Sequence, residues 1–181
     1  MTNVESLAKA SKELMLKEPF YGLLLMSLNK VWSDKLPTAG VRLKGINYEL
    51  AINPSFWESL PMEQKVGILK HELLHIGFFH LVNFTKYSNK KILNIAMDLE
   101  INQYIERSWL PEGGMFLDTF PELDLEERAG TRYYYDKLME LMQEQEETMQ
   151  CIMNAISNGE SECELPNGEK IRHPIVTGKR I

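Results

Sequence analysis

The sequence contains few cysteines and no excess of basic residues, and both shortages exclude classes of protein. Cys151 and Cys163 are the only cysteines in 181 residues, and although they could pair, two thiols are too few for a disulfide framework. Their scarcity favours a reduced compartment. The 20 lysines and arginines are outnumbered by 26 aspartates and glutamates, which gives a net charge of −6 without any basic stripe. We therefore do not expect nucleic acid as a partner.

Long apolar runs are also missing. The longest, Phe20 to Leu28, falls far short of the ~20 residues that span a bilayer. The N-terminal residues carry charges along their length, among them Glu5 and Lys12, so they do not resemble a signal peptide. We therefore expect a soluble, cytoplasmic protein with no membrane partner. A hydrophobic fraction of 44% is enough to build the core of a domain.

The periodicity of the apolar residues is mostly helical. It predicts helices at residues 2–18, 20–32, 62–76, 91–107 and 126–150. Two short strands are expected at 41–43 and 46–52, joined by a hairpin turn at Lys44-Gly45. Apolar and polar residues alternate in the second strand, which predicts that it is half buried. The fold class that follows is α+β, mostly helical, with a small sheet.

The periodicity fades towards the C-terminus. Glycine, asparagine, glutamate and proline become frequent after Ser157, and Asn167-Gly168 predicts a hairpin turn before a short strand at 169–172. We expect one domain over residues 1–150. Residues 151–181 are expected to be a C-terminal tail or the start of a following region that is truncated.

Three of the four histidines fall between positions 71 and 80. His71-Glu72-Leu73-Leu74-His75 reads H-E-x-x-H within a predicted helix, where residues four apart lie on the same face. His71 and His75 can therefore direct two imidazoles at one zinc ion, and Glu72 can reach a water molecule beside it as a general base. A solvated helix face is the plain alternative, but the flanking residues are strongly apolar. The pattern therefore predicts a metal site.

A catalytic zinc ion usually has three protein ligands, so a third ligand is needed. His80 is one candidate. On a continuous helix it would lie on about the opposite face from His71, so it can reach the metal only if the helix breaks near Gly77 and the chain turns back. The alternative role for His80 is a histidine buried beneath the site.

Asp98 is the other candidate. Asn94, Asp98 and Asn102 are each four residues apart in a broadly apolar helix and form one polar stripe. A carboxylate in such surroundings needs a partner. Asp98 could ligate the metal, orient a ligating histidine, or have a hydrogen-bonding role unrelated to the metal. Asn94 and Asn102 are candidates for the same supporting positions.

Several segments together resemble a known family, the putative metallopeptidase domain that often precedes a von Willebrand factor A-like domain in bacterial and phage proteins. The likeness covers about residues 15–140, and its most specific motifs are the His-Glu box and Asn94-Ile95-Ala96-Met97-Asp98. The other segments that carry it are Glu18 to Gly22, Leu36 to Ala39, Tyr48 to Phe56, Leu110 to Gly113 and Tyr135 to Leu138.

The resemblance implies a zincin-like fold, in which an active-site helix lies beside a small sheet whose edge strand binds an extended peptide. It also implies metal-dependent peptide hydrolysis, with His71 and His75 as ligands, Glu72 as general base, and His80 and Asp98 at polar positions of the site. The spacing from His75 to His80 is one residue shorter than in the long metzincin motif, and no von Willebrand factor A-like half is present.

These observations predict a zinc-dependent peptidase that acts on a peptide or protein. We expect zinc rather than another divalent metal because histidine nitrogen is a common zinc ligand. Strand 46–52 is expected to pair with the substrate main chain if its edge is free. The alternative function is a non-catalytic metal-binding or adaptor domain with a structural zinc in a partner assembly. Besides a substrate, the protein is expected to bind either another protein or the missing von Willebrand factor A-like domain.

Overall fold

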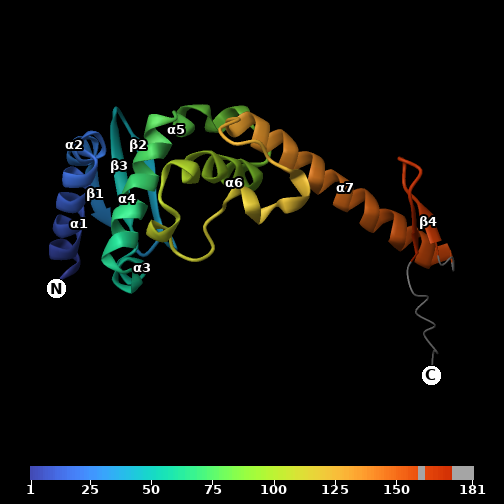
Figure 1. Cartoon of the computed structure of the whole chain (residues 1–181), viewed down its shortest axis with the longest axis horizontal. Helices are drawn as coiled ribbons and strands as arrows, with labels where there is room; N and C mark the ends of the chain where they lie inside the picture. The colour runs from blue at the N-terminus through green and yellow to red at the C-terminus, as the bar shows by residue number, and fades with distance from the viewer. Residues whose placement is uncertain (159–161, 173–181) are drawn as a thin grey trace, which may run out of the picture. The chain divides into compact units, whose positions relative to one another are not determined.

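The computed structural model describes residues 1–158 and 162–172 (Figure 1). By contacts the chain divides into two units, Met1–Tyr135 and Asp136–Ile181. The elements confirm an α+β fold that is mostly helical with a small sheet. The first unit contains α1 (Asn3–Lys17), α2 (Pro19–Ser27), β1 (Asn29–Trp32), β2 (Ala39–Lys44), β3 (Asn47–Ile52), α3 (Pro54–Ser59), α4 (Met62–Gly77), α5 (His80–Asn83) and α6 (Lys90–Ile101).

The predicted helix over residues 20–32 is wrong in its second half. Helix α2 ends at Ser27, Leu28 is extended, and residues 29–32 form the strand β1 instead. Strand β1 pairs in parallel with β3, and the Trp32 ring packs edge-on against the ring of Trp57 at 6.2 Å. The pairing and this aromatic contact are tertiary interactions, and they override a local pattern that continues the helix.

The sheet has the strand order β1-β3-β2, so β3 lies in the middle and β2 lies at an edge. Strand β3 was predicted to be half buried, which is wrong, because it is buried on both faces from Glu49 onward. The Glu49 carboxylate is covered by ion pairs with Arg42 and Lys44 of the neighbouring strand. Ile46 was expected within the strand, but it lies in the turn and is 94% exposed.

Helix α4 lies at the centre of the first unit and contacts α1, α2, β2 and α6. Its apolar side chains, among them Val66, Leu69 and Leu73, are fully buried in the main hydrophobic core with Trp57. The indole N–H of Trp57 donates a hydrogen bond of 3.1 Å to the Ser6 hydroxyl, so this buried polar group is satisfied. The helix that carries the motif is therefore held on several sides, which favours a precise side-chain geometry.

The last two long helices differ from their predicted bounds. Helix α6 was expected to reach residue 107, but it ends at Ile101 and short 3-10 helices follow. Helix α7 (Thr131–Asn158) was expected over 126–150, but it begins later and continues further. Gly130, with φ +91°, immediately precedes it. Tyr134 and Leu138 of α7 are buried.

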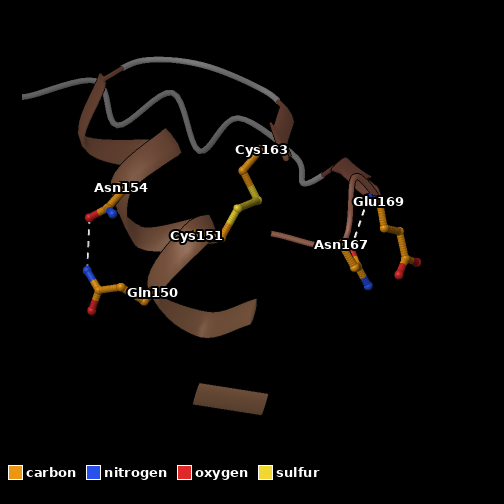
Figure 2. Close-up of a disulfide and its surroundings, with 6 residues drawn as sticks. All are labelled: Gln150, Cys151, Asn154, Cys163, Asn167 and Glu169. Carbon is orange, nitrogen blue, oxygen red and sulfur yellow. Dashed lines mark hydrogen bonds between the residues drawn. A yellow bond between two sulfur atoms is a disulfide. The ribbon is translucent and has the colours of Figure 1, made fainter. Parts of the chain in front are cut away.

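The second unit contains most of α7 and the hairpin of β4 (Glu162–Glu164) and β5 (Lys170–Arg172). The predicted turn at Asn167-Gly168 is confirmed, with Gly168 at φ +84°. Cys151 of α7 and Cys163 of β4 form a disulfide (Figure 2). The sequence had left open whether the two cysteines pair, and the reduced cellular compartment stays a prediction.

None of the helices in the described part of the chain has the length and apolar character needed to span a membrane. The tail predicted for 151–181 falls partly outside the described residues, and the boundary at 150 stays a prediction.

Candidate metal centre

Two imidazoles of α4 and one carboxylate of α6 converge at a single point. The Nε2 atoms of His71 and His75 lie 3.1 Å apart. An Oδ1 atom of Asp98 lies 3.5 Å from the first and 3.4 Å from the second. Among the residues that the structure describes, these three form the group of side chains suited to hold a metal ion. The helical spacing of the two histidines produces two of the three members of this cluster, and the packing of α6 beside α4 supplies the third.

The cluster has the dimensions of three corners of a zinc tetrahedron. Zinc bonds of about 2.0–2.1 Å to nitrogen and oxygen place adjacent ligand atoms about 3.3 Å apart. The three separations, 3.1, 3.4 and 3.5 Å, bracket that value. The residues present therefore fit a zinc ion with one coordination position left for a water molecule or a substrate, which is the arrangement of catalytic rather than structural sites.

The outer nitrogen of His71 has an amide partner. His71 Nδ1 lies 2.8 Å from the Asn102 side-chain oxygen, and the Asn102 amide nitrogen donates to the Met115 carbonyl oxygen over 2.8 Å. The second contact fixes which end of the amide faces the histidine, so Nδ1 must donate. The lone pair of His71 is then on Nε2, the atom that faces the cluster. The predicted supporting role of Asn102 is consistent with this contact.

His80 lies next to the cluster without joining it. Its Nδ1 lies 2.9 Å from Nδ1 of His75, on the side away from the converging Nε2 atoms, and its Nε2 lies 3.1 Å from Glu100 Oε2. The side chain is only 4% exposed. This placement agrees with the buried histidine that the sequence left as the alternative to a third ligand. Asp98, and not His80, lies in the group of side chains that could hold a metal ion.

The chain turns back after α4, and this reversal brings His80 into contact with His75. Gly77 is the last residue of α4, and the reversal occurs at Phe79, which has φ +58° and ψ +27°. This left-handed conformation is unusual for a bulky residue and costs about 1–3 kcal/mol, a strain found most often at functional sites. The glycine marked the right region of the sequence, but the neighbouring aromatic residue makes the turn.

Glu72 faces the same space as the cluster and is held by the sheet. Its Oε2 accepts a hydrogen bond of 2.9 Å from the Val41 N–H of β2, and the residue is 7% exposed. This contact fixes the orientation of the carboxylate. The second oxygen remains to meet a water molecule or substrate.

The protonation of the buried groups follows from their neighbours. Burial lowers the pKa of His75, but the hydrogen bond to Asp98 and the charge of Glu72 outweigh it and raise the pKa overall. Burial keeps the pKa of His80 below its ordinary value in spite of Glu100. Burial alone would raise the pKa of Glu100, yet hydrogen bonds from His80 and Thr131 lower it. Glu100 is thus charged and His80 neutral at neutral pH.

A cavity of about 790 Å³ opens over the cluster. Its walls come from β2, α4, α6 and the loop after Leu110, and Asn94 of the predicted polar stripe lies on its surface. Tyr48, Tyr87 and Tyr104 are not among its lining residues, so their hydroxyls are not placed to donate to a substrate oxygen there. The cavity is large enough for several residues of a peptide, since drug-sized ligands occupy about 300–1,000 Å³.

Sequence reasoning missed three groups of the site. Glu100 lies off the polar stripe, and its carboxylate contacts His80. Thr131, the first residue of α7, bonds to the Glu100 carboxylate. The Val41 N–H is a main-chain group. No local pattern identifies such partners, because each contact joins segments distant in the sequence.

These features define a mostly helical α+β protein with a candidate metal site made by two histidines of the H-E-x-x-H helix and one carboxylate of α6. The chain belongs to the family described as "Putative metallopeptidase domain", whose model matches residues 2–172. This result confirms the family resemblance. No curated protein and no solved structure matches the chain.

Proposed function

We propose that this protein is a zinc-dependent peptidase with a zincin-like active site. The observation that carries the proposal is the open three-ligand cluster of His71, His75 and Asp98 with the Glu72 carboxylate beside it and a cavity above. His71 and His75 are neutral nitrogen ligands and Asp98 is an anionic oxygen ligand, a set that suits zinc. The family description supports a metal-dependent hydrolase.

A bound zinc ion supplies a Lewis acid that polarises the scissile carbonyl and makes a neighbouring water molecule more acidic. The chain contributes the proton transfer. Glu72, oriented by the Val41 N–H, accepts the proton of the attacking water on its second oxygen and returns it to the leaving amine.

The strand that would hold a peptide is β2 rather than the predicted strand 46–52. The predicted strand corresponds to β3, whose two edges are both paired, so it cannot add a substrate strand. Strand β2 has one edge outside the sheet, and the Val41 N–H points from that edge to Glu72. Main-chain groups alternate in direction along an antiparallel strand, so those of Leu43 face the same way. An extended peptide would pair there.

Replacing Leu43 with proline tests this edge. The substitution removes an N–H that does not bond to β3, so the fold is expected to persist, and the Michaelis constant for a cleaved peptide is expected to rise about 2- to 10-fold for one lost hydrogen bond. Leu43→Ala keeps the N–H and separates the effect of the side chain. Gly40→Pro removes an N–H that faces β3 and is expected to lower the thermal midpoint. An unchanged Michaelis constant in Leu43→Pro would remove β2 from the proposal.

A non-catalytic domain with a structural zinc is the competing function. Such sites are closed by four protein ligands. Three ligand atoms converge among the described residues, and the nearest further histidine nitrogen, on His80, faces His75 Nδ1 instead. The proposal of a catalytic site is better supported by this geometry.

The proposed function is tested by measuring the metal content of the protein and then its cleavage of peptides. Elemental mass spectrometry of tag-free protein is expected to give about one zinc per chain, and His75→Ala should lose it. The zinc-loaded protein should then cleave members of a peptide library, and a chelator should stop the reaction. Zinc bound without any cleavage would favour the structural alternative. Failure to take up zinc would overturn both functions.

A further inference from the structure

We propose that Glu112 selects the substrate, so that the protein prefers peptides with a lysine or arginine at one position near the cleaved bond. The inference rests on the proposed function and names the substrate class of the same cavity. Glu112 belongs to a wall segment, residues 110–115, and every residue of this segment lines the cavity over the cluster. The proposed chemistry uses none of these residues, so their place on the wall points to recognition of the substrate.

The wall segment begins at a close contact with the helix that carries the motif. Gly67 lies one turn before His71 on α4, and a Cβ atom added to it would be 1.9 Å from the Trp109 carbonyl oxygen. No side chain fits in that space, so the glycine lets the main chain just before the wall segment lie directly against α4. The ammonium of Lys17 lies 4.4 Å from the centre of the Trp109 ring. The start of the wall therefore has a fixed place beside the two histidines.

The wall segment also ends at a fixed point. The Met115 carbonyl oxygen accepts a hydrogen bond of 2.8 Å from the Asn102 side chain. The next residue, Phe116, has its ring 4.2 Å from the guanidinium carbon of Arg107. The segment is thus held at both ends by the elements that build the site.

Between these ends the chain makes a tight turn. The Gly114 N–H donates to the Pro111 carbonyl oxygen over 3.3 Å, and Gly113 has φ +90°. A positive φ at the third position is typical of a type II turn, which glycine adopts without strain. Glu112 occupies the second position of this turn. The place of its main chain on the cavity wall is therefore well defined.

Glu112 differs from the other charged side chains of the cavity, because in the described part of the chain it forms no ion pair and no hydrogen bond. Asp98 faces the cluster, and Glu72 is bonded to the sheet. The Arg42 guanidinium is paired with the buried Glu49. Among the described lining residues, an acidic substrate side chain therefore meets no unpaired cationic side chain, whereas a basic one meets an open carboxylate.

An extended peptide in the cavity brings its side chains to this wall. Successive side chains of an extended chain point to opposite sides, and a cavity of about 790 Å³ holds several residues. Lysine and arginine lay their long stems along apolar surface and extend their charge to a polar group beyond it. Charge complementarity of this kind selects among substrates more than it adds affinity. We therefore expect a clear but moderate preference.

The preference is measured with peptides that differ in one residue. In a cleaved library peptide, each position near the scissile bond is replaced in turn by lysine, glutamine or glutamate, and kcat/KM is determined. At one position lysine should exceed glutamine, and glutamine should exceed glutamate, each by about 1.5- to 5-fold, the range for an exposed ion pair. High salt should reduce both ratios, because Glu112 is exposed. Equal rates at every position would overturn the inference and leave the peptidase in place.

Exchanging the charge of Glu112 identifies the residue responsible. Glu112→Gln should bring the three rates at that position together, and Glu112→Lys should reverse their order. Both changes fall on an exposed residue of a turn, so the fold should persist. Glu106→Gln is the matched control and should keep the wild-type order, because Glu106 is exposed but is not among the described residues that line the cavity. A lysine preference that survives Glu112→Lys would overturn the inference.

Binding to the metal-free protein separates this inference from the proposed function. Two labelled sets of library peptides, identical except that lysine replaces glutamate, are compared by fluorescence anisotropy. The lysine set should bind more tightly to the wild type, and the glutamate set to Glu112→Lys. This order without any cleavage by the zinc-loaded protein would overturn the peptidase and support Glu112 as the recognition residue of a peptide-binding site. Equal binding of the two sets, or binding of neither, would overturn the inference.

Discussion

Replacing Glu72 with glutamine is expected to leave zinc bound and to lower peptide hydrolysis about 10²- to 10⁴-fold, the usual contribution of a general base. The amide has the size of the carboxylate, and its oxygen can still accept from the Val41 N–H, so the side chain should stay in place. It cannot take a proton from water. The effect should therefore fall on the turnover number, with little change in metal content or thermal midpoint.

The measurement is the turnover number of zinc-loaded protein on a peptide from the library, with zinc content determined on the same samples. Glu63→Gln is a matched control, because Glu63 lies on the same helix but is exposed in its first turn. Full activity in Glu72→Gln would refute the general-base assignment. Loss of zinc in the variant would instead show that Glu72 supports the metal rather than the proton transfer.

Replacing Asp98 with alanine is expected to weaken zinc binding by roughly 10²- to 10³-fold. A structural zinc site gains about 10–16 kcal/mol from four ligands, so each ligand accounts for about 3 kcal/mol or somewhat more. Alanine is a good helix former, and Asp98 is about a third exposed, so α6 should persist. The loss is expected to appear in chelator competition, with little change in the thermal midpoint of the metal-free protein.

The comparison with His80→Asn decides the third ligand. A residue that only supports His75 should cost about 10- to 100-fold in affinity, less than the loss in Asp98→Ala. Asn94→Ala, one turn before Asp98 and on the cavity surface, serves as the control and should leave affinity unchanged. A larger loss in His80→Asn than in Asp98→Ala would reverse the assignment and make His80 the ligand.

The errors in the predicted fold have a common physical origin. Residues 29–32 continue the apolar pattern of α2 and were assigned to a helix, but they become β1 because β3 offers a parallel partner. Strand β3 alternates as if one face were solvated, yet ion pairs from Arg42 and Lys44 cover Glu49 on the other face. In each case pairing with another strand changes the environment that the local pattern assumes.

The sequence by itself determined the centre of the site. The spacing in H-E-x-x-H places His71 and His75 on one face of a helix, and this holds wherever the helix packs. The same local periodicity identified Asp98 and Asn102 as a polar stripe and the region of Gly77 as the end of α4. Helical geometry is local, so it can be derived from neighbouring residues alone.

Only the tertiary structure decided how these parts meet. The packing of α6 beside α4 brings Asp98 to within 3.5 Å of both histidines, and the turn at Phe79 directs His80 to the outer nitrogen of His75. Strand β2 rather than β3 offers a free edge, and Thr131 reaches Glu100 from 31 residues away. Such choices depend on the packing of distant segments, and the free energy that selects among them is not contained in any local spacing.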